Sequence, residues 1–277
     1  MSQAIQHMPT SPSESTFELA TIQRLQALGY RYLHGSEIDR SLHTVVLEGS
    51  LRVYLRRRYA HLPAAAIEQA IQIISAPEGA TLDRRNMAFQ HLLREGVTLR
   101  YEADSGEERH EHLYFLDFER PGQNEFLVVN QLTVQGGAPG QAGNTRRPDV
   151  VIYVNGLPLV VFELKNPWDE YADVAGAHNQ IGHYTVDIPQ LFNFNAFCVV
   201  SDGNTTLHGM HSAGFEWFAP WKSIDGETVE ANTTGSMKTL IEGLFPKDRL
   251  LDYVRNYIVH EVVNDRITKK GAKYHQY

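Results

Sequence analysis

The chain has 277 residues, 42% of them hydrophobic and 21% charged, and its formal net charge at pH 7 is −8. Its length allows one large domain or two modest ones. The negative charge excludes a protein that coats nucleic acid through general electrostatics, so any contact with phosphates must be local. The sequence has no apolar run of about 18 residues and no signal-peptide pattern, which predicts a cytoplasmic protein with no membrane span.

Cysteine and histidine usage argues against a metal site built from these residues. The single cysteine, Cys198, lies in the apolar run 196–200 and is expected to be a buried core thiol, so it offers neither a disulfide nor a zinc cluster. The 13 histidines show no metal-binding spacing such as HExxH, and we interpret them as scattered surface or hydrogen-bonded side chains.

The first part of the chain is predicted to be helical and then to change to strands. Residues 1–15 are rich in Ser, Pro and Gln and lack periodicity, which predicts a disordered tail. Apolar residues at helical spacing predict helices at about 17–28, 42–59, 64–75 and 82–95. Alternation then predicts three strands, as antiparallel neighbours, at 98–101, 111–118 and 125–134.

The second part of the chain mixes strands and helices. It is predicted to form strands at 149–154 and 159–165, a helix at 171–184, a buried strand at 196–201, short strands near 207 and at 215–218, and helices within 237–258. We therefore expect a mixed α/β (α+β) fold in which a mixed central β-sheet is flanked by helices, with a helical N-terminal third.

Three charged residues interrupt two adjoining apolar runs, and they are the strongest functional signal in the sequence. Asp149 opens the first run, whereas Glu163 and Lys165 lie near the end of the second. A buried ionisable group costs a few kcal/mol unless it is paired or binds a metal. Two neighbouring carboxylates are suitable ligands for magnesium. Lys165 lies on the same strand face as Glu163 and can orient an attacking water or offset charge on a pentavalent phosphorane.

The pairing of the two strands decides whether the two acids meet. With a regular two-residue loop at Asn155-Gly156, Asp149 would oppose Phe162 and point away from Glu163. A three-residue loop or a β-bulge shifts the pairing by one residue, so that Asp149 opposes Glu163. We predict one of these two irregularities. The alternative is that Asp149 caps a turn and that Glu163 and Lys165 form an exposed charge pattern.

Further candidates lie on predicted helices. Gln180 and Tyr184 share a helix face and could reach a DNA phosphate or Lys165, although helix packing is an alternative. Glu18 lies on the inward stripe of the first helix and is a candidate for a metal or supporting role, or else a helix cap. Basic residues that could contact DNA are Arg146 and Arg147 before Asp149, and Arg56 and Arg57 in a run that could also be a solvated face.

A longer stretch around these residues resembles the N-terminal nuclease region of the R (restriction) subunit of type I restriction enzymes, a PD-(D/E)xK nuclease with a restriction-endonuclease-like core of the RecB-like branch. Its motif maps onto Asp149, Glu163 and Lys165, and the QxxxY element onto Gln180 and Tyr184. The backbone carbonyl of Leu164 is added as a metal ligand. The matching segments are 128–133, 147–151, 155–167, 180–184, 191–196 and 200–203.

The resemblance implies an activity and a set of partners. It implies a nuclease domain over 16–260 with a helical insertion at about 42–95, and a connector at 261–277 to an ATP-dependent translocase. The expected cofactor is Mg²⁺, for which Mn²⁺ could substitute, while ATP and S-adenosylmethionine would act only in the full complex. The expected partners are double-stranded DNA and the modification and specificity subunits. No G-x-x-x-x-G-K-[ST] loop occurs in the chain.

Two other functions remain open from the sequence. One is a stand-alone RecB-like repair nuclease. The other is a catalytically silent module that docks the translocase. Convergence of Asp149, Glu163 and Lys165 would favour a nuclease over the silent module.

Overall fold

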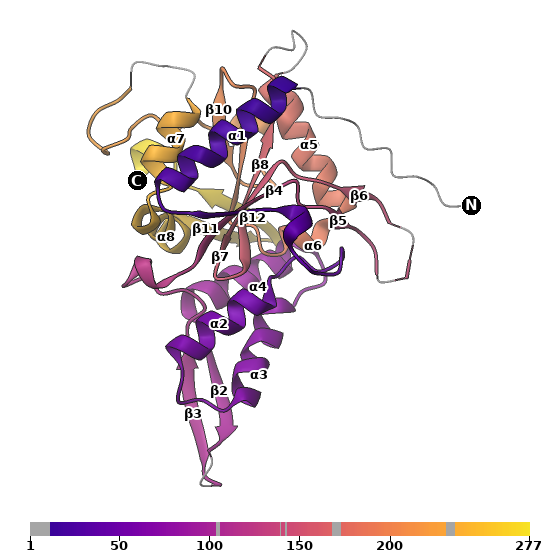
Figure 1. Ribbon diagram of the computed structural model, residues 1–277, viewed down its shortest axis with the longest axis vertical. Coiled ribbons are helices and arrows are strands. Elements are labelled where there is room, and N and C mark those ends of the chain that lie inside the picture. The colour runs from indigo at the N-terminus through magenta and orange to yellow at the C-terminus, as the bar shows by residue number, and fades with distance from the viewer. Residues whose placement is uncertain (1–11, 104–105, 139, 142, 168–172, 231–235) are drawn as a thin grey trace.

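The computed structural model describes residues 12–103, 106–138, 140–141, 143–167, 173–230 and 236–277 (Figure 1). Its centre is a mixed six-stranded sheet. The strand order is β1 (Arg31–His34), β4 (Phe126–Asn130), β7 (Val150–Val154), β8 (Leu157–Leu164), β9 (Phe197–Ser201) and β10 (Thr206–Gly209). The pairs β1–β4 and β8–β9 are parallel, and the other pairs are antiparallel. The predicted mixed α/β class is therefore confirmed.

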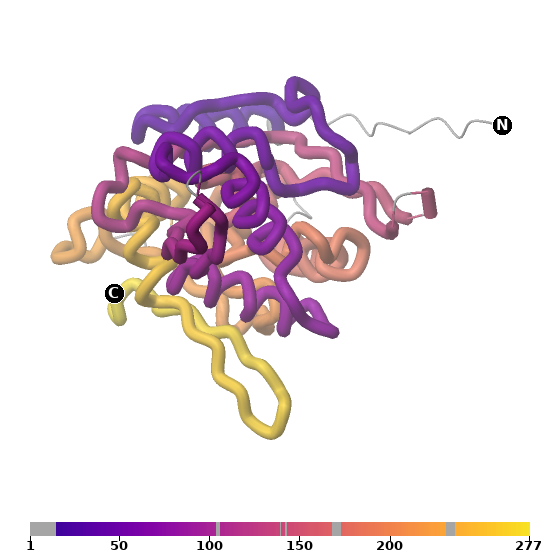
Figure 2. The backbone as a smooth tube through the Cα atoms, turned by 90° about the horizontal axis from the view of Figure 1, so that it is seen from below, coloured from indigo at the N-terminus to yellow at the C-terminus, as the bar shows by residue number. Residues whose placement is uncertain are grey.

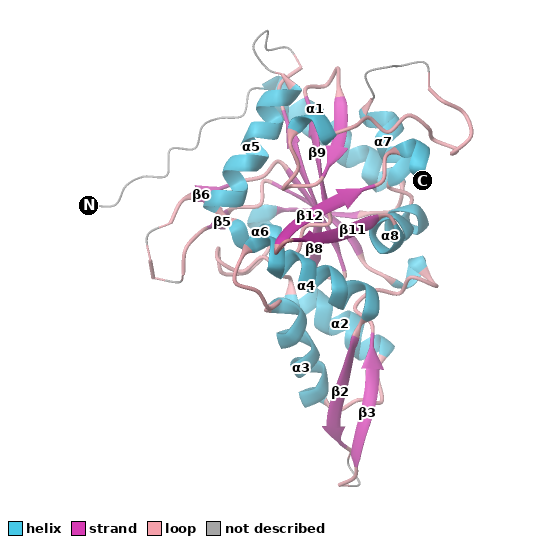
Figure 3. Cartoon of the chain, turned by 180° about the vertical axis from the view of Figure 1, so that it is seen from behind, coloured by secondary structure: helices cyan, strands magenta, loops and turns pink. Residues whose placement is uncertain are grey.

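Helices cover both faces of the sheet (Figures 1 and 3). On one face, Phe162 of β8 packs against Phe245, with ring centroids 5.4 Å apart. The helices of this face are α1 (Pro12–Ala27), α7 (Met237–Leu244) and α8 (Lys247–Asn256). On the other face, α5 (Val174–Asp187) contacts β8 and β9 and forms the crossover between these parallel strands. Every residue of β4, β7, β8 and β9 is buried, as expected for strands covered on both faces.

A second part of the chain extends from one end of the sheet and lies at the bottom of Figure 1. It contains α2 (Glu48–Arg58), α3 (Ala64–Ser75), β2 (Val97–Glu102) and β3 (Glu108–Leu113), while α4 (Leu82–Glu95) joins it to the main body. The antiparallel pairing of β2 with β3 is confirmed. The third predicted neighbour, 125–134, was placed wrongly, because β4 lies in the central sheet between β1 and β7.

Several element boundaries differ from the sequence predictions. The predicted helix at 42–59 begins only at Glu48, because the N–H of Leu47 bonds to the carbonyl of Gly156. The first helix begins at Pro12, so the predicted tail is too long; residues 1–11 lie outside the described part. The predicted helix at 171–184 is observed at Val174–Asp187, and 171–172 lie outside the described residues. The prediction for 111–118 was too long, since β3 ends at Leu113.

The C-terminal segment contains a hairpin that the sequence analysis missed. Strands β11 (Ile258–Val263) and β12 (Arg266–Gly271) pair antiparallel and project from the body in Figure 2. Asn264 and Asp265 form the two-residue turn with positive φ angles of 48° and 66°, as a type I′ hairpin turn requires. The predicted strand at 215–218 was also wrong. Short 3-10 helices are observed at η1 (Gly35–Glu37), η2 (Pro121–Gln123), η3 (Phe215–Trp217) and η4 (Tyr274–Gln276).

The hairpin of β7 and β8 contains the predicted bulge. Its turn has only two residues, Asn155 and Gly156, with φ angles of +50° and +83°. Val154 pairs with Leu157, but beyond the next pair the register shifts so that Ile152 pairs with Val160. Leu159 is therefore the extra residue on β8.

The tight turn predicts a large stability effect at Gly156. A Cβ atom there would lie 2.3 Å from the carbonyl oxygen of Leu47, and φ is positive. Gly156→Ala is expected to lower the free energy of unfolding by about 2–3 kcal/mol, measured by urea denaturation. Gly182→Ala is the matched control, because a Cβ on this exposed helical glycine meets nothing within 4 Å. The control is expected to stabilise by about 0.5–1 kcal/mol. Equal effects of the two substitutions would contradict the proposed close approach.

Among the helices of the described residues, none is long and apolar enough to cross a lipid bilayer.

Candidate active site

The bulge places the side chains of Asp149 and Glu163 on the same face of the sheet, at one end of β7 and β8. Val150 pairs with Phe162, so continuing the ladder by one residue places Asp149 opposite Glu163. Both side chains are buried, with 7% and 4% of their surface exposed. Asp149 Oδ2 accepts a hydrogen bond of 2.7 Å from the backbone N–H of Leu164. This bond holds the Asp149 carboxylate against the end of β8.

Glu163 is the centre of a group of polar side chains. Its Oε1 accepts a hydrogen bond of 2.9 Å from the ammonium of Lys165, and its Oε2 accepts one of 3.0 Å from the hydroxyl of Tyr184. The backbone N–H of Lys165 bonds to the carbonyl of Ser201 at 2.7 Å, which extends the β8–β9 ladder and fixes where Lys165 leaves the sheet. Because Glu163 is buried, the alternative interpretation as an exposed charge pattern is wrong for this residue.

The hydroxyl of Tyr184 lies close to both carboxylates. Its pKa is raised far above the ordinary tyrosine value, first by burial and then by the negative charges of Glu163 and Asp149. A hydrogen bond with Gln180, one turn earlier on α5, lowers the pKa in part. The structure thus brings Asp149, Glu163, Lys165, Gln180 and Tyr184 together at one site.

The donor atoms at this site fit a hard divalent cation. The carboxylates of Asp149 and Glu163 supply anionic oxygens, and Leu164, whose carbonyl is the further candidate ligand, lies directly after Glu163. Mg²⁺ prefers oxygen ligands and commonly uses one or two carboxylates while retaining several waters. Over the described ranges, no three Asp, Glu, His or Cys side chains gather closely enough to hold an ion together. Among the described residues the site thus offers the two carboxylates of Asp149 and Glu163.

Glu18 is buried, and its carboxylate is hydrogen-bonded to side chains at the end of β4. Its two carboxylate oxygens accept bonds from the amides of Asn130 and Gln131, at 2.5 and 2.6 Å. Asn130 pairs with Val150, so its side chain points to the face covered by α1, opposite to the face of Glu163. The N–H of Gln131, whose φ is +53°, bonds to the backbone carbonyl of Asp149. Glu18 is thus linked to Asp149 through Gln131, and a supporting role remains a prediction.

The two arginines before Asp149 have different surroundings. Arg146 forms an ion pair of 2.6 Å with Asp187, the last residue of α5. Arg147 is half-buried, and its guanidinium makes no ion pair with the described residues. Arg146 would lose this ion pair on contacting a phosphate, whereas Arg147 has no ion pair with the described residues to lose.

The candidate arginines of α2 lie far from the carboxylates. The start of α2 contacts the Asn155-Gly156 turn, whereas Asp149 and Glu163 lie at the other end of the same strands, about 20 Å away at the usual rise per residue. Arg56 lies 3.7 Å from Glu68, and Arg57 donates a hydrogen bond to the carbonyl of Gln123. The structure does not bring Arg56 and Arg57 to the candidate site.

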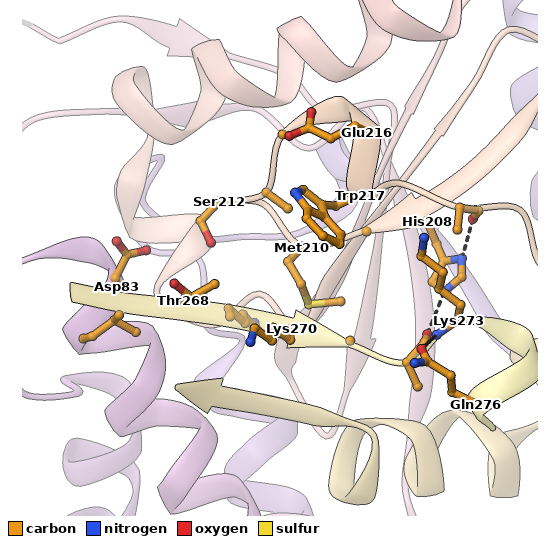
Figure 4. A pocket seen from close by; sticks show the side chains of 18 of the residues that line it. Asp83, His208, Met210, Ser212, Glu216, Trp217, Thr268, Lys270, Lys273 and Gln276 are labelled. Atoms are coloured by element: carbon orange, nitrogen blue, oxygen red, sulfur yellow. Dashed lines mark hydrogen bonds between the residues drawn. The ribbon is translucent and has the colours of Figure 1, made fainter. Parts of the chain in front are cut away.

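A cavity of about 940 Å³ lies in another part of the protein. It is formed between β12 and the segment that follows β10, with Thr268 and Lys270 on one side and Met210, Ser212 and Trp217 among the residues opposite (Figure 4). None of the five residues of the candidate site, Glu163 and the four around it, lines this cavity. The polar residues of the candidate site and this cavity therefore lie in different parts of the molecule.

The fold and the site define a mixed α/β protein with a buried pair of carboxylates beside a lysine at one end of its sheet. The model of the family "Type I restriction enzyme R protein N terminus" matches residues 11–217. The chain belongs to this family.

Individual relatives agree with this assignment. The chain is 37% identical to the type I restriction enzyme HindI endonuclease subunit of Haemophilus influenzae, over 96% of this chain and 26% of that protein. It is 29% identical to the putative type I restriction enzyme MjaIXP endonuclease subunit of Methanocaldococcus jannaschii, over 88% of this chain and 25% of that protein. The chain thus spans about a quarter of the length of these relatives.

Proposed function

We propose that this chain is the DNA-cleaving part of a type I restriction enzyme and hydrolyses phosphodiester bonds with the help of Mg²⁺. The observation that carries the proposal is the bulge at Leu159, which sets Asp149 opposite Glu163, with Lys165 and Tyr184 bonded to Glu163. Burying two acids side by side is costly unless a cation offsets their charge. A bound cation would relieve that cost and provide the chemistry.

Each residue of the site has a defined task in this proposal. Asp149 and Glu163, with the carbonyl of Leu164, would hold the metal, which supplies Lewis-acid activation of water and phosphate when bound. The ammonium of Lys165 orients the attacking water or offsets charge on the phosphorane. The hydroxyl of Tyr184 holds Oε2 of Glu163, so that the carboxylate keeps one orientation.

The names of the relatives support a role for this activity within a larger enzyme. The curated relatives are endonuclease subunits of type I restriction enzymes. In the intact enzyme we expect double-stranded DNA as substrate, modification and specificity subunits as partners, and ATP and S-adenosylmethionine as requirements of the whole complex. A stand-alone repair nuclease is disfavoured by these names. A silent docking module is disfavoured by the convergence of the five polar side chains.

Metal binding by the 277-residue chain tests the proposal directly. We expect Mn²⁺, followed by electron paramagnetic resonance, to bind one or two sites, and binding to weaken at least about tenfold in Asp149→Asn or Glu163→Gln, since each removes an anionic ligand. Glu261→Gln is the control, because this exposed acid pairs with Lys270 on the C-terminal hairpin. Unchanged Mn²⁺ binding in both site variants would overturn the assignment of the ligands.

Tyr184→Phe tests the contact with Glu163. Removing the hydroxyl deletes one hydrogen bond to a charged group, worth about 1.5 kcal/mol, so the cleavage rate of the intact enzyme is expected to fall about tenfold. Single-turnover plasmid cleavage measures this rate. Thr185→Ala is the control, because its hydroxyl donates a hydrogen bond within the helix, to the carbonyl of Gly182. Equal rates in Tyr184→Phe and the unmodified enzyme would remove Tyr184 from the site.

A further inference from the structure

A carboxylate at the end of α5 binds the segment that leads into Asp149. Oδ2 of Asp187 accepts a hydrogen bond of 2.6 Å from Nε of Arg146 and forms an ion pair of 2.6 Å with a terminal nitrogen of the same guanidinium, and its Oδ1 accepts a hydrogen bond of 2.5 Å from the amide of Asn144. The pKa of Asp187 is lowered, first by the hydrogen bond from Asn144 and further by Arg146. All the acceptor atoms of this carboxylate are therefore directed at a single neighbouring segment.

That segment is a short hairpin of β5 (Val134–Gln135) and β6 (Thr145–Arg146), and its backbone also packs on the end of α5. A Cβ atom added to Gly136 would lie 1.8 Å from the carbonyl oxygen of Asp187, so only glycine permits this approach. The amide of Gln190 donates a hydrogen bond of 2.7 Å to the carbonyl of Gln135. The hairpin is thus fixed to the end of α5 and to α6 (Pro189–Phe192), the short helix that follows it and contains Gln190.

The position of Asp187 on its helix points to a purpose beyond helix formation. The C-terminus of a helix carries partial negative charge, which disfavours an acid there by about 0.3–1 kcal/mol. Asp187 is the last residue of α5, and its side chain is 12% exposed. Its partners Arg146 and Asn144 offset this penalty. The sequence shows an acid before Ile188-Pro189 at this helix end, but it does not show which residues that acid contacts.

We propose that Asp187 is a positioning residue that sets the location of Asp149 relative to Glu163. One helix reaches both acids: Tyr184 holds Glu163 directly, and Asp187, three residues later, holds Arg146, three residues before Asp149. This inference rests on the proposed nuclease function and adds to it. It makes Arg146 an internal tether and leaves Arg147 as the arginine that contacts a DNA phosphate.

The test measures Mn²⁺ binding to the 277-residue chain and Mg²⁺-dependent cleavage by the intact enzyme. Asp187→Ala and Arg146→Ala are expected to weaken Mn²⁺ binding about fivefold and to raise the Mg²⁺ concentration at half-maximal cleavage by a similar factor. The exchange Asp187→Arg with Arg146→Asp is expected to recover most of both losses. Arg147→Ala is expected to leave Mn²⁺ binding unchanged and to weaken DNA binding. Asp265→Ala, which removes a remote ion pair with Arg84, is the control for loss of such a pair.

The outcomes separate this inference from the function on which it rests. If the unmodified chain binds no Mn²⁺, or if Glu163→Gln, Asp149→Ala and Lys165→Ala all cut DNA normally, the nuclease assignment itself fails. If Glu163→Gln abolishes cleavage while Asp187→Ala keeps the Mn²⁺ affinity and the Mg²⁺ midpoint of the unmodified enzyme, only the positioning role fails. A fall in thermal stability with an unchanged metal midpoint would mean that the Asp187 contact is merely structural, which also overturns the proposal.

Discussion

Glu163→Gln is expected to lower the rate of DNA cleavage by the intact enzyme at least about a thousandfold. The substitution keeps the shape of the side chain but removes the negative charge that would bind the metal and pair with Lys165. Plasmid cleavage under single-turnover conditions measures the loss. ATP hydrolysis by the same preparation serves as the internal reference, since we expect translocation to continue at its normal rate.

Two further variants of the site and one control test the same expectation for DNA cleavage. Asp149→Ala and Lys165→Ala should also abolish cleavage while sparing ATP-driven translocation, because each removes a different part of the same site. Glu261→Gln on the hairpin of β11 and β12 should cut DNA at the normal rate. Normal cutting by Glu163→Gln, Asp149→Ala and Lys165→Ala together would end the nuclease assignment.

Lys269 is expected to make the stability of the chain strongly dependent on pH. Its side chain on β12 is buried, with 4% of the residue exposed, and its ammonium donates hydrogen bonds of 2.9 and 2.6 Å to Asn86 Oδ1 and the carbonyl of Asn195. Burial lowers its pKa to about 7, from an ordinary value of 10.5. Because burial penalises the charged form, the penalty is fully present below pH 7 and is relieved as the pH rises towards 10.5.

The size of this effect follows from the shift in pKa. A slope of 1.36 kcal/mol per pH unit acts between the folded and unfolded pKa values, so Lys269 should add up to about 4 kcal/mol to the free energy of unfolding between pH 7 and pH 10. Urea denaturation of the 277-residue chain and of Lys269→Met, compared at several pH values, isolates this contribution. Lys270→Met, which changes the exposed neighbour on the same strand, is the control. If the difference between the unmodified chain and Lys269→Met did not change with pH, the buried ammonium would not be the cause.

Local signals in the sequence predicted some helices accurately. The predicted ranges 64–75 and 82–95 are the observed α3 and α4. For α4 the reason is visible at both ends: the hydroxyl of Thr81 accepts a bond from the N–H of Arg84, and Gly96 follows the last residue with a φ of +72°. Helix ends that are set by a few neighbouring residues can therefore be predicted from the sequence alone.

Long-range contacts explain the predictions that were wrong. The segment 42–47 has helical spacing, but the bond from Leu47 to Gly156 holds it in another conformation. The strand at 126–130 follows β3 in sequence yet pairs with β1 and β7, partners that periodicity cannot identify. Side-chain alternation alone therefore predicts that a segment is a strand, but not which strands pair with it.

The candidate site was predicted in part for the same reasons. Asp149, Glu163 and Lys165 were identifiable because charges interrupt apolar runs, and the number of residues between the two acids indicated either a three-residue loop or a bulge, of which the structure has the bulge. The contact of Asp187 with Arg146 joins residues 41 positions apart, and no local pattern indicates it. The separation of Arg56 and Arg57 from the site likewise depends on which end of the sheet α2 contacts.

The bulge at Leu159 lets the hairpin absorb a change of one residue in its length. One added residue next to Asn155-Gly156 can be accommodated by a longer turn, which would leave the distal pairing of the two acids intact. One residue removed from 157–162 can be accommodated by loss of the bulge, because a regular two-residue hairpin whose second strand is one residue shorter again sets Asp149 opposite Glu163. Single-residue insertions at the turn and single-residue deletions in β8 should therefore both leave the two acids facing each other.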